Sequence, residues 1–264
     1  MQLPRTLARP AFTDVSREAL AAAAPDLAAV PAEFIRHGLR AKAPQMQAGI
    51  AALAPSHLPQ SIPKSHLPST LTVPLRATSA AHPSYPTHVL AVTSSKSRSE
   101  PASLFPVHGV VLAAHCAKLP RLPPAQHGSR SSATLPVLPF SLPSPQAFTI
   151  LHPYMYTHRL DAALAALLPL PPAFLETLAP GPSADAPHAR VSAALSSRSA
   201  IHALAAHLAA SAGGSLSALM AHAGHVKELW QDMVALGLYD AELWDALDLA
   251  WEVVLAALNL AAAQ

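Results

Sequence analysis

Proline recurs through most of this chain and limits where regular structure can form. There are 28 prolines among 264 residues, about twice the usual share. Because proline lacks a backbone N–H and fixes φ, helix interiors and central strands cannot run through such a density. Hydrophobic residues make up 51% of the chain but aromatic residues only 5%, and much of the rest is alanine, which buries little area. We therefore expect the folded core to occupy only part of the chain.

The N-terminal third is predicted to be its least ordered part. Residues 14–30 and 32–43 could form helices, but their apolar faces are mostly alanine and would pack weakly. Across residues 55–86, prolines and serines recur every few positions, which is typical of a linker. We predict a largely disordered or weakly helical arm and linker over residues 1–84, followed by one α+β domain over residues 85–264.

The first half of that domain predicts a small sheet. Short runs rich in β-branched residues indicate three strands, at residues 87–92, 107–112 and 135–142. A short helix is expected at residues 113–118. Pro136 and Pro139 would restrict the third strand to an edge or an irregular position. Flexible inserts are expected at about residues 119–134 and 179–198.

The second half of the domain is predicted to be helical. A helix starts at Ser144, a preferred N-cap residue, and Pro153 should kink or break it. Two amphipathic helices follow near the C-terminus, the first stopped by Gly237 and the second capped by Asp240. Their short connection predicts an antiparallel hairpin. The tryptophans in these helices are expected to be core residues first and partner anchors second: Trp230, Trp244 and Trp251.

Charge is divided unevenly along the chain. Residues 1–130 hold 13 Lys and Arg against 5 Asp and Glu, whereas residues 131–264 hold 4 against 10. A basic, proline-rich arm suits a nuclear import signal or a loose acidic partner, although composition bias is the commoner explanation. Without a run of five basic residues, direct nucleic-acid binding is not expected. With a single cysteine and no recognisable signal peptide or apolar span, the expected location is the nucleus or cytoplasm, without membrane contact.

We find no motif that would carry catalysis or hold a cofactor. His222 and His225 could share a helix face, but a third metal ligand with local spacing is missing. A Gly-x-Ser-x-Gly elbow and a phosphate-binding glycine loop are both missing. Cys116 follows His115, but adjacent helical residues point apart, and buried packing is the better explanation for this cysteine. The sequence predicts neither an enzyme nor a metal or cofactor site.

The last helix carries an acidic stripe opposite its apolar face. A solvated surface is the usual explanation for such a stripe, but its density also makes it a candidate surface for a partner protein. Its members are Asp245, Asp248, Glu252 and Asn259. The edge of the predicted sheet is the other candidate surface.

Two segments resemble the core of BTB/POZ domains, a family of protein-binding modules that often dimerise. They are FPVHGVVLAAHCAKLP at Phe105–Pro120 and LPSPQAFTILHPYMYTHRLD at Leu142–Asp161. The family shows a strand ending in His before a Val-Leu-Ala-Ala helix start, and later a Ser-x-x-x-Phe-x-x-Leu-x-x-Tyr-x-Tyr-Thr helix. The resemblance implies a three-stranded BTB/POZ-like sheet with helices and a possible homodimer. The implied core residues are His108, Leu112, Phe148, Leu151, Tyr154 and Tyr156.

A longer resemblance, over residues 108–262, is to the clampless family of mushroom-forming and smut fungi. It rests on HGVVLAAHC, LPSPQAF, YMYTHRLDAAL, LAAHLA and, most specifically, LWQDMVALGLYDAELWDALDLAWEVVLAAL at Leu229–Leu258. This resemblance implies a regulator of clamp-cell formation and dikaryotic growth. It also implies that the regulator acts through protein contacts, downstream of mating-type transcription factors.

The preferred hypothesis is therefore a non-enzymatic, protein-binding regulator of fungal sexual development, with transcription regulators as suspected partners. One alternative is a BTB-type adaptor that brings substrates to a cullin ubiquitin ligase. Another is a hydrolase of unrecognised type that uses the abundant His and Ser residues, against which the missing motifs count.

Overall fold

The protein is described here by a computed structural model that covers residues 3–80, 82–97, 99–126, 131–181 and 186–263. The chain divides into two compact units. The sheet unit consists of Phe12–Thr157 and Ala235–Tyr239, and the helical unit consists of Met1–Ala11, His158–Val234 and Asp240–Gln264. Each unit therefore combines segments from the N-terminal and C-terminal parts of the chain.

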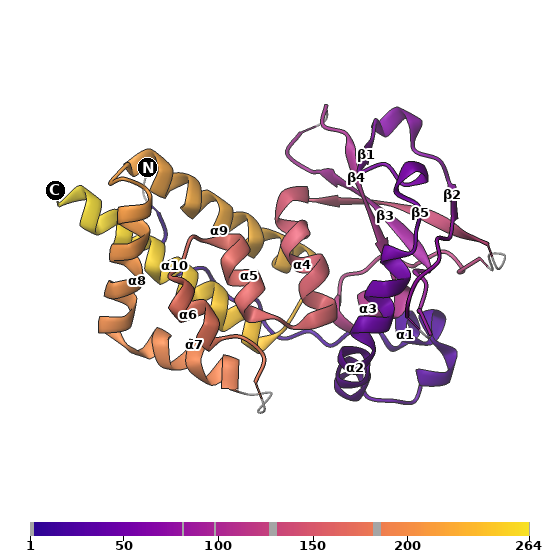
Figure 1. The fold of residues 1–264 in the computed structure, drawn as a ribbon, viewed down its shortest axis with the longest axis horizontal. Coiled ribbons are helices and arrows are strands. Elements are labelled where there is room, and N and C mark those ends of the chain that lie inside the picture. The colour runs from indigo at the N-terminus through magenta and orange to yellow at the C-terminus, as the bar shows by residue number, and fades with distance from the viewer. Residues whose placement is uncertain (1–2, 81, 98, 127–130, 182–185, 264) are drawn as a thin grey trace. The chain divides into compact units, whose positions relative to one another are not determined.

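Within the described residues, five strands form one sheet in the order β1-β4-β3-β5-β2 (Figure 1). The strands are β1 Ser61–Ile62, β2 Thr70–Pro74, β3 His88–Ser94, β4 Ala102–Val107 and β5 Ser132–Leu142. Strand β3 pairs in parallel with β5, and the remaining pairs are antiparallel. The α+β class is confirmed, but the sheet has five strands and not the three predicted.

Strand β3 lies at the centre of the sheet and is covered on both faces. Val89, Leu90, Ala91 and Val92 are each 0% exposed, and successive side chains of a strand point to opposite faces. On one face, Phe148 of α4 (Pro145–Thr157) packs edge-on against Phe105 of β4, with ring centroids 4.9 Å apart. The opposite face packs into a separate apolar cluster that contains Val89 and Ala91.

That second cluster corrects the prediction of a disordered linker. Aliphatic residues spaced every few positions between residues 53 and 75 pack into it. They are Leu53, Leu58, Ile62, Leu67, Leu71, Val73 and Leu75. The prolines of this segment prevent long helices or strands, but the residues between them still cover an apolar sheet face. Regular periodicity, which the prediction relied on, is not needed for that kind of burial.

The first residues of the predicted arm are also folded. They form α1 (Arg17–Ala23), capped by the Ser16 hydroxyl, and α2 (Ala32–Ala51), with short 3₁₀ turns at Pro25–Leu27, Pro55–His57 and Lys64–His66. Helix α2 packs against α3 (Gly109–His115) and α4. Its residues Ile35, Leu39 and Met46 are buried. The sequence did not predict this buried stripe, because each turn of the alanine-rich helix contributes only one buried residue to it.

The predicted strand at residues 107–112 is wrong, because the strand ends at Val107 and α3 begins at Gly109. The β-branched pair Val110 and Val111 suggested a strand, but His108 marks the break, with an extended backbone and a side chain held by Tyr156. Helix α4 also continues through Pro153, so of the predicted kink or break the break is wrong.

Strand β5 explains how a proline-rich strand can lie inside a sheet. Residues 132–136 pair with β2 and residues 137–142 pair with β3. Each half of the strand therefore has a paired strand on one side only, as at the edge of a sheet, where proline is tolerated. The strand therefore joins β2 to β3 in the sheet order, and yet each of its halves pairs with only one of these two strands.

The helical unit confirms the helical C-terminus. Its helices are α5 Leu160–Leu167, α6 Pro172–Thr177, α7 Ala186–Ser196, α8 Arg198–Ser211, α9 Leu216–Leu236 and α10 Ala241–Ala262. Helix α10 packs against α5, α7 and α8. Gly237, with φ of 63°, follows α9, and the Asp240 carboxylate accepts from the Leu243 N–H at 3.0 Å, as predicted.

The two predicted flexible inserts are only partly described. Helix α7 lies inside the insert predicted at residues 179–198, and β5 begins inside the insert predicted at residues 119–134. Residues 127–130 and 182–185 lie outside the described part of the chain. The second insert is thus more regular than its small residues suggested, whereas residues 119–126 of the first have no helix or strand, as predicted.

Two glycines of α2 test whether this N-terminal helix is part of the folded core. A Cβ at Gly49 would lie 1.6 Å from the Ser84 carbonyl oxygen, whereas a Cβ at Gly38 would meet nothing within 4 Å. We expect Gly49→Ala to lower the free energy of unfolding by about 3 kcal/mol, because overpacking against backbone cannot relax. Gly38→Ala should raise it by about 0.5–1 kcal/mol through helix propensity. Urea unfolding measures both, and a neutral Gly49→Ala would contradict the packing of α2.

Candidate functional site

The acidic stripe of α10 is the most polar surface that the sequence singled out. Asp245 and Asp248 are three residues apart and therefore share one side of the helix. Their side chains are 22% and 28% exposed. Glu252 is also half-buried, and Asn259 is exposed. The acidic end of the stripe is thus partly covered, whereas its last member is open to solvent.

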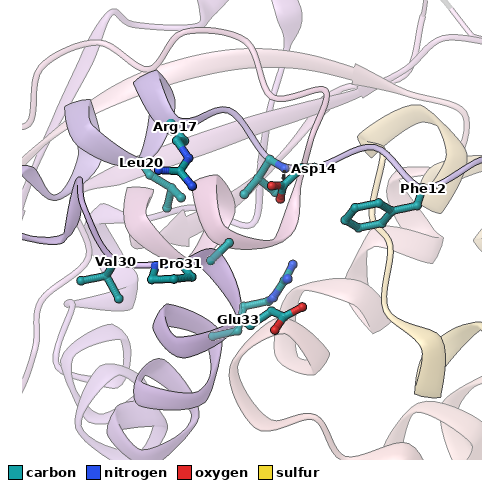
Figure 2. Close-up of a pocket in the computed structure, with 10 residues that line it drawn as sticks. Phe12, Asp14, Arg17, Leu20, Val30, Pro31 and Glu33 are labelled. Atoms are coloured by element: carbon teal, nitrogen blue, oxygen red, sulfur yellow. Dashed lines mark hydrogen bonds between the residues drawn. The ribbon is translucent and has the colours of Figure 1, made fainter.

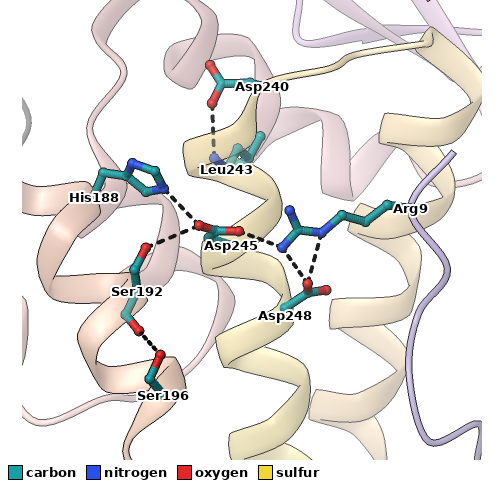
Figure 3. A network of polar contacts seen from close by, with 8 residues as sticks. All are labelled: Arg9, His188, Ser192, Ser196, Asp240, Leu243, Asp245 and Asp248. Carbon is teal, nitrogen blue, oxygen red and sulfur yellow. Dashed lines mark hydrogen bonds and ion pairs between the residues drawn. The ribbon is translucent and has the colours of Figure 1, made fainter. Parts of the chain in front are cut away.

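Arg9 contacts both aspartates (Figure 3). Its guanidinium donates from one terminal nitrogen to Asp245 Oδ1 at 2.6 Å and from Nε to Asp248 Oδ2 at 2.9 Å. The flat guanidinium fork suits two neighbouring carboxylates. Because Arg9 is distant in sequence and its segment is irregular, no local pattern could have predicted this contact.

Asp245 is also held from α7. His188 Nε2 lies 2.8 Å from its second oxygen, and the Ser192 hydroxyl donates to the same oxygen at 3.2 Å (Figure 3). Burial acts to raise the pKa of Asp245, but the hydrogen bonds from Arg9, His188 and Ser192 and the charge of Arg9 outweigh it, and the pKa is lowered. This carboxylate is therefore ionised and fixed in one orientation.

Asp248 differs from its neighbour. Burial raises its pKa, and the charge of Asp245 adds to the rise, so that the hydrogen bonds and the charge of Arg9 offset only part of the shift. Burial acts to lower the pKa of Arg9, but the two carboxylates outweigh it and raise that pKa. Asp248 therefore gains most from an arginine close to it, because without one it would be a partly buried charge beside a like charge.

Two tryptophans bind the same N-terminal segment, residues 3–11. The indole Nε1–H of Trp230 in α9 donates to the Ala8 carbonyl at 2.9 Å, and that of Trp251 in α10 donates to the Pro4 carbonyl at 3.2 Å. Leu7 between them is 5% exposed. Trp251 and Trp244 are buried at 2% and 0%, and Trp230 is half-buried. The segment was predicted to lie in a disordered arm, so sequence reasoning missed both contacts.

The residues that resemble a BTB/POZ core are all buried in the sheet unit. His108 joins the two motifs, because its backbone N–H donates to the Tyr156 hydroxyl at 3.0 Å. The ring Nε2 lies 3.0 Å from the Ser84 carbonyl oxygen and must be the donor there. The Tyr156 hydroxyl then donates to the unprotonated Nδ1 at 3.0 Å. Leu112, Phe148, Leu151 and Tyr154 are each at most 2% exposed.

Two more histidines are held in the same way. His152 Nε2 donates to the Pro106 carbonyl at 3.1 Å, and His88 Nε2 donates to the Pro123 carbonyl at 2.7 Å. Burial lowers the pKa of His88 and of His108, and it lowers the pKa of His152 to about 4. All three rings are therefore neutral at pH 7, with a carbonyl already bound to their N–H.

The single cysteine lies in the core of the sheet unit. Cys116 is 2% exposed, and its Sγ lies 3.9 Å from Met155 Sδ. Burial raises the pKa of its thiol to about 12. A nucleophilic cysteine needs a populated thiolate, so this residue packs as a small apolar side chain, as predicted.

A hollow of about 300 Å³ opens beside α1 and α2 (Figure 2). Its charged lining consists of Arg17 and Arg36 together with Asp14 and Glu33. Arg36 also donates to the Ala114 carbonyl at 3.2 Å. Because two cations balance two anions, the hollow favours neither an anionic nor a cationic ligand. A larger hollow of about 610 Å³ is lined by His88, but both ring nitrogens of His88 already have partners.

The remaining histidines form no metal centre in the part of the chain that the structure describes. Burial, and then the neighbouring His225, lower the pKa of His222. No group of three or more His, Cys, Asp or Glu side chains within the described ranges could hold a metal ion. Within the same ranges, every helix is too short or too polar to span a lipid bilayer.

Comparison with protein families gives two matches that together cover most of the chain. Residues 10–143 match the family model of the Clampless protein 1 N-terminal domain, and residues 161–264 match that of the Clampless protein 1 C-terminal domain. The gap between the two matches contains the change from the sheet unit to the helical unit at Thr157 and His158. No curated protein and no solved structure matches the chain.

The buried neutral histidines predict a stability that falls in acid. Burial lowers the pKa of His152 from its ordinary value of 6.5 to about 4 in the folded protein, so the unfolded chain binds a proton first as the pH falls. The stabilisation is complete above about pH 6.5 and is lost as the pH falls toward 4. Between pH 7 and 5, His152 alone should cost about 2 kcal/mol of unfolding free energy.

Urea unfolding of the His152→Phe variant at both pH values measures this contribution. The variant should lose about 2 kcal/mol less than the wild type between pH 7 and 5. Phe148→Leu is the matched control, because it weakens the same cluster without removing a titratable group and should lower stability equally at both pH values. An unchanged pH dependence in His152→Phe would contradict the assignment.

Proposed function

The chain belongs to the Clampless protein 1 family, and from this membership we propose that it is a regulator of clamp-cell formation and sexual development that works by binding other proteins. Family membership carries the developmental role. The protein-binding mechanism, the absence of an enzymatic activity and transcription regulators as partners are parts of the proposal. So is a location in the nucleus, the cytoplasm or both.

The acidic stripe supports the binding part of this proposal. Asp245 is oriented by His188 and Ser192 from the neighbouring helix α7, so one end of the stripe is rigid. Glu252 and Asn259 continue it along the same helix. A rigid helix that presents ordered carboxylates gives a partner a fixed pattern of charge, and such patterns set the specificity and the rate of association.

The single cysteine and three of the histidines are engaged in the core, which supports a non-enzymatic role. The Cys116 thiol is buried with a raised pKa. His88, His108 and His152 each donate to a backbone carbonyl. Each of these rings therefore uses its N–H to hold a proline-containing segment of the chain.

The BTB/POZ-like part of the proposal rests on a smaller set of contacts. The two motifs that resemble that family meet at His108 and Tyr156, which supports their belonging to one interaction module. A module of this kind could also self-associate. Co-purification of a cullin with the protein would favour the adaptor function over the developmental regulator.

Charge reversal on the stripe tests the proposal in cells. We expect Asp248→Arg combined with Glu252→Arg to reduce capture of a specific partner from mating cells by about tenfold, the effect of losing about 1.4 kcal/mol of binding free energy. The pair leaves Asp245 and its contacts with α7 in place. The same variant should fail to restore clamp cells in a strain that lacks the protein.

The control is Glu176→Arg, which reverses an exposed charge on α6 of the same unit. It should retain both the partners and the clamp cells. Mass spectrometry of the captured proteins, with melting temperatures of all variants, separates lost binding from lost folding. If the stripe variant folds and keeps every partner, the acidic stripe is not the working surface.

A further inference from the structure

We propose that the surface formed by Trp230, Asp245, Asp248 and Trp251 is a binding site for an extended, arginine-bearing segment of a partner protein, and that residues 3–9 of this chain occupy the site in its absence. This α9–α10 site deepens the proposed function, on which it rests, by naming the chemistry of the partner. Its recognition elements are visible because a segment of the chain is bound there.

The segment has a defined direction on the helices. Pro4 is bound by Trp251, and Arg9 by Asp248 and Asp245. The segment therefore runs antiparallel to α10. Apart from a bend at Arg5 and Thr6, it has no secondary structure of its own. Both carbonyls that receive an indole N–H belong to a peptide backbone outside helices and strands, so a segment of another sequence could offer the same acceptors.

Side chains of the segment divide into bound and unbound positions. Leu7 is 5% exposed, and Arg9 forms the fork with the two aspartates. Pro4, Arg5, Thr6 and Ala8 have exposed side chains. The site therefore selects a leucine and an arginine two positions apart and accepts other residues around them. Charge complementarity identifies the occupant as basic, because Asp248 is a partly buried carboxylate whose pKa is raised beside Asp245.

The contacts of the segment are weak enough to exchange. They are two indole hydrogen bonds, one aliphatic side chain and one arginine whose side chain is 33% exposed. Partly exposed ion pairs contribute only about 0.2–1 kcal/mol each. A tethered segment holds its place mainly because its effective concentration is high, in the millimolar range for a short tether. A partner segment with additional contacts can displace it.

The test uses the full chain with its own segment weakened. The probe is a fluorescein-labelled peptide with the sequence of residues 3–11, LPRTLARPA. It is titrated with the wild type and with the double variant Leu7→Glu and Arg9→Glu, called the weakened chain, and fluorescence anisotropy measures its binding. The weakened chain should bind the peptide at least about tenfold more tightly than the wild type, because the tethered competitor is lost. Adding Asp248→Arg and Glu252→Arg to the weakened chain should abolish the binding.

Matched controls separate the site from general charge attraction. Arg5→Glu changes an exposed arginine of the same segment and should leave peptide affinity at the wild-type level. A peptide with Glu in place of its second arginine should not bind. If the double variant Leu7→Glu and Arg9→Glu fails to fold, Arg9→Glu alone replaces it. The expected gain in affinity for the peptide is then smaller.

Three outcomes would overturn the proposal. One is equal peptide affinity for the wild type and the folded weakened chain. Another is peptide binding that survives the Asp248 and Glu252 reversals. The third is a wild-type dimer in light scattering that the peptide dissociates, which would make a second copy of the chain the occupant. The peptide could also bind as expected while the stripe variant keeps all its cellular partners. That result would support the α9–α10 site as a peptide-binding site and reject only its role in the proposed function.

Discussion

The central strand β3 is the constraint on which the sheet unit depends. Its residues Val89 to Val92 are fully buried, so both faces of one strand require an apolar cover. Helix α4 supplies one cover through Phe148. The proline-rich stretch between residues 53 and 75 supplies the other. In a chain with few aromatic residues, irregular segments with frequent aliphatic side chains become part of the core, and the N-terminal region is thereby ordered.

The abundance of proline and the buried histidines are connected. Proline keeps segments out of regular structure, and their carbonyl oxygens then need donors from elsewhere. His88 donates to Pro123 and His108 to Ser84, both in irregular segments, and His152 donates to Pro106 within strand β4. The histidines that suggested chemistry therefore act as neutral donors in the core. Burial lowers their pKa, so this arrangement is stable only where the rings stay unprotonated.

Helix α10 organises the helical unit in a comparable way. Its apolar side packs against α5, α7 and α8, which leaves its carboxylates partly buried at the rim. Partly buried carboxylates require donors, and Arg9 and His188 provide them. The surface that the charge pattern singled out as a partner site is thus partly occupied from within the chain. Whether this surface is available to a partner depends on residues 3–9. No sequence pattern in that N-terminal segment suggested such a role.

Short-range patterns in the sequence determined the α+β class, the C-terminal helices, the Gly237 stop, the Asp240 cap and the family. Each of these follows from neighbouring residues, through helical periodicity, capping or a contiguous motif. Only the tertiary structure decided the two outer strands, the role of the proline-rich segment and the contact of Arg9 with Asp245 and Asp248. Those features join residues that are far apart in the chain. Their free energy comes from covering a face or neutralising a charge, and no local pattern of residues records that requirement.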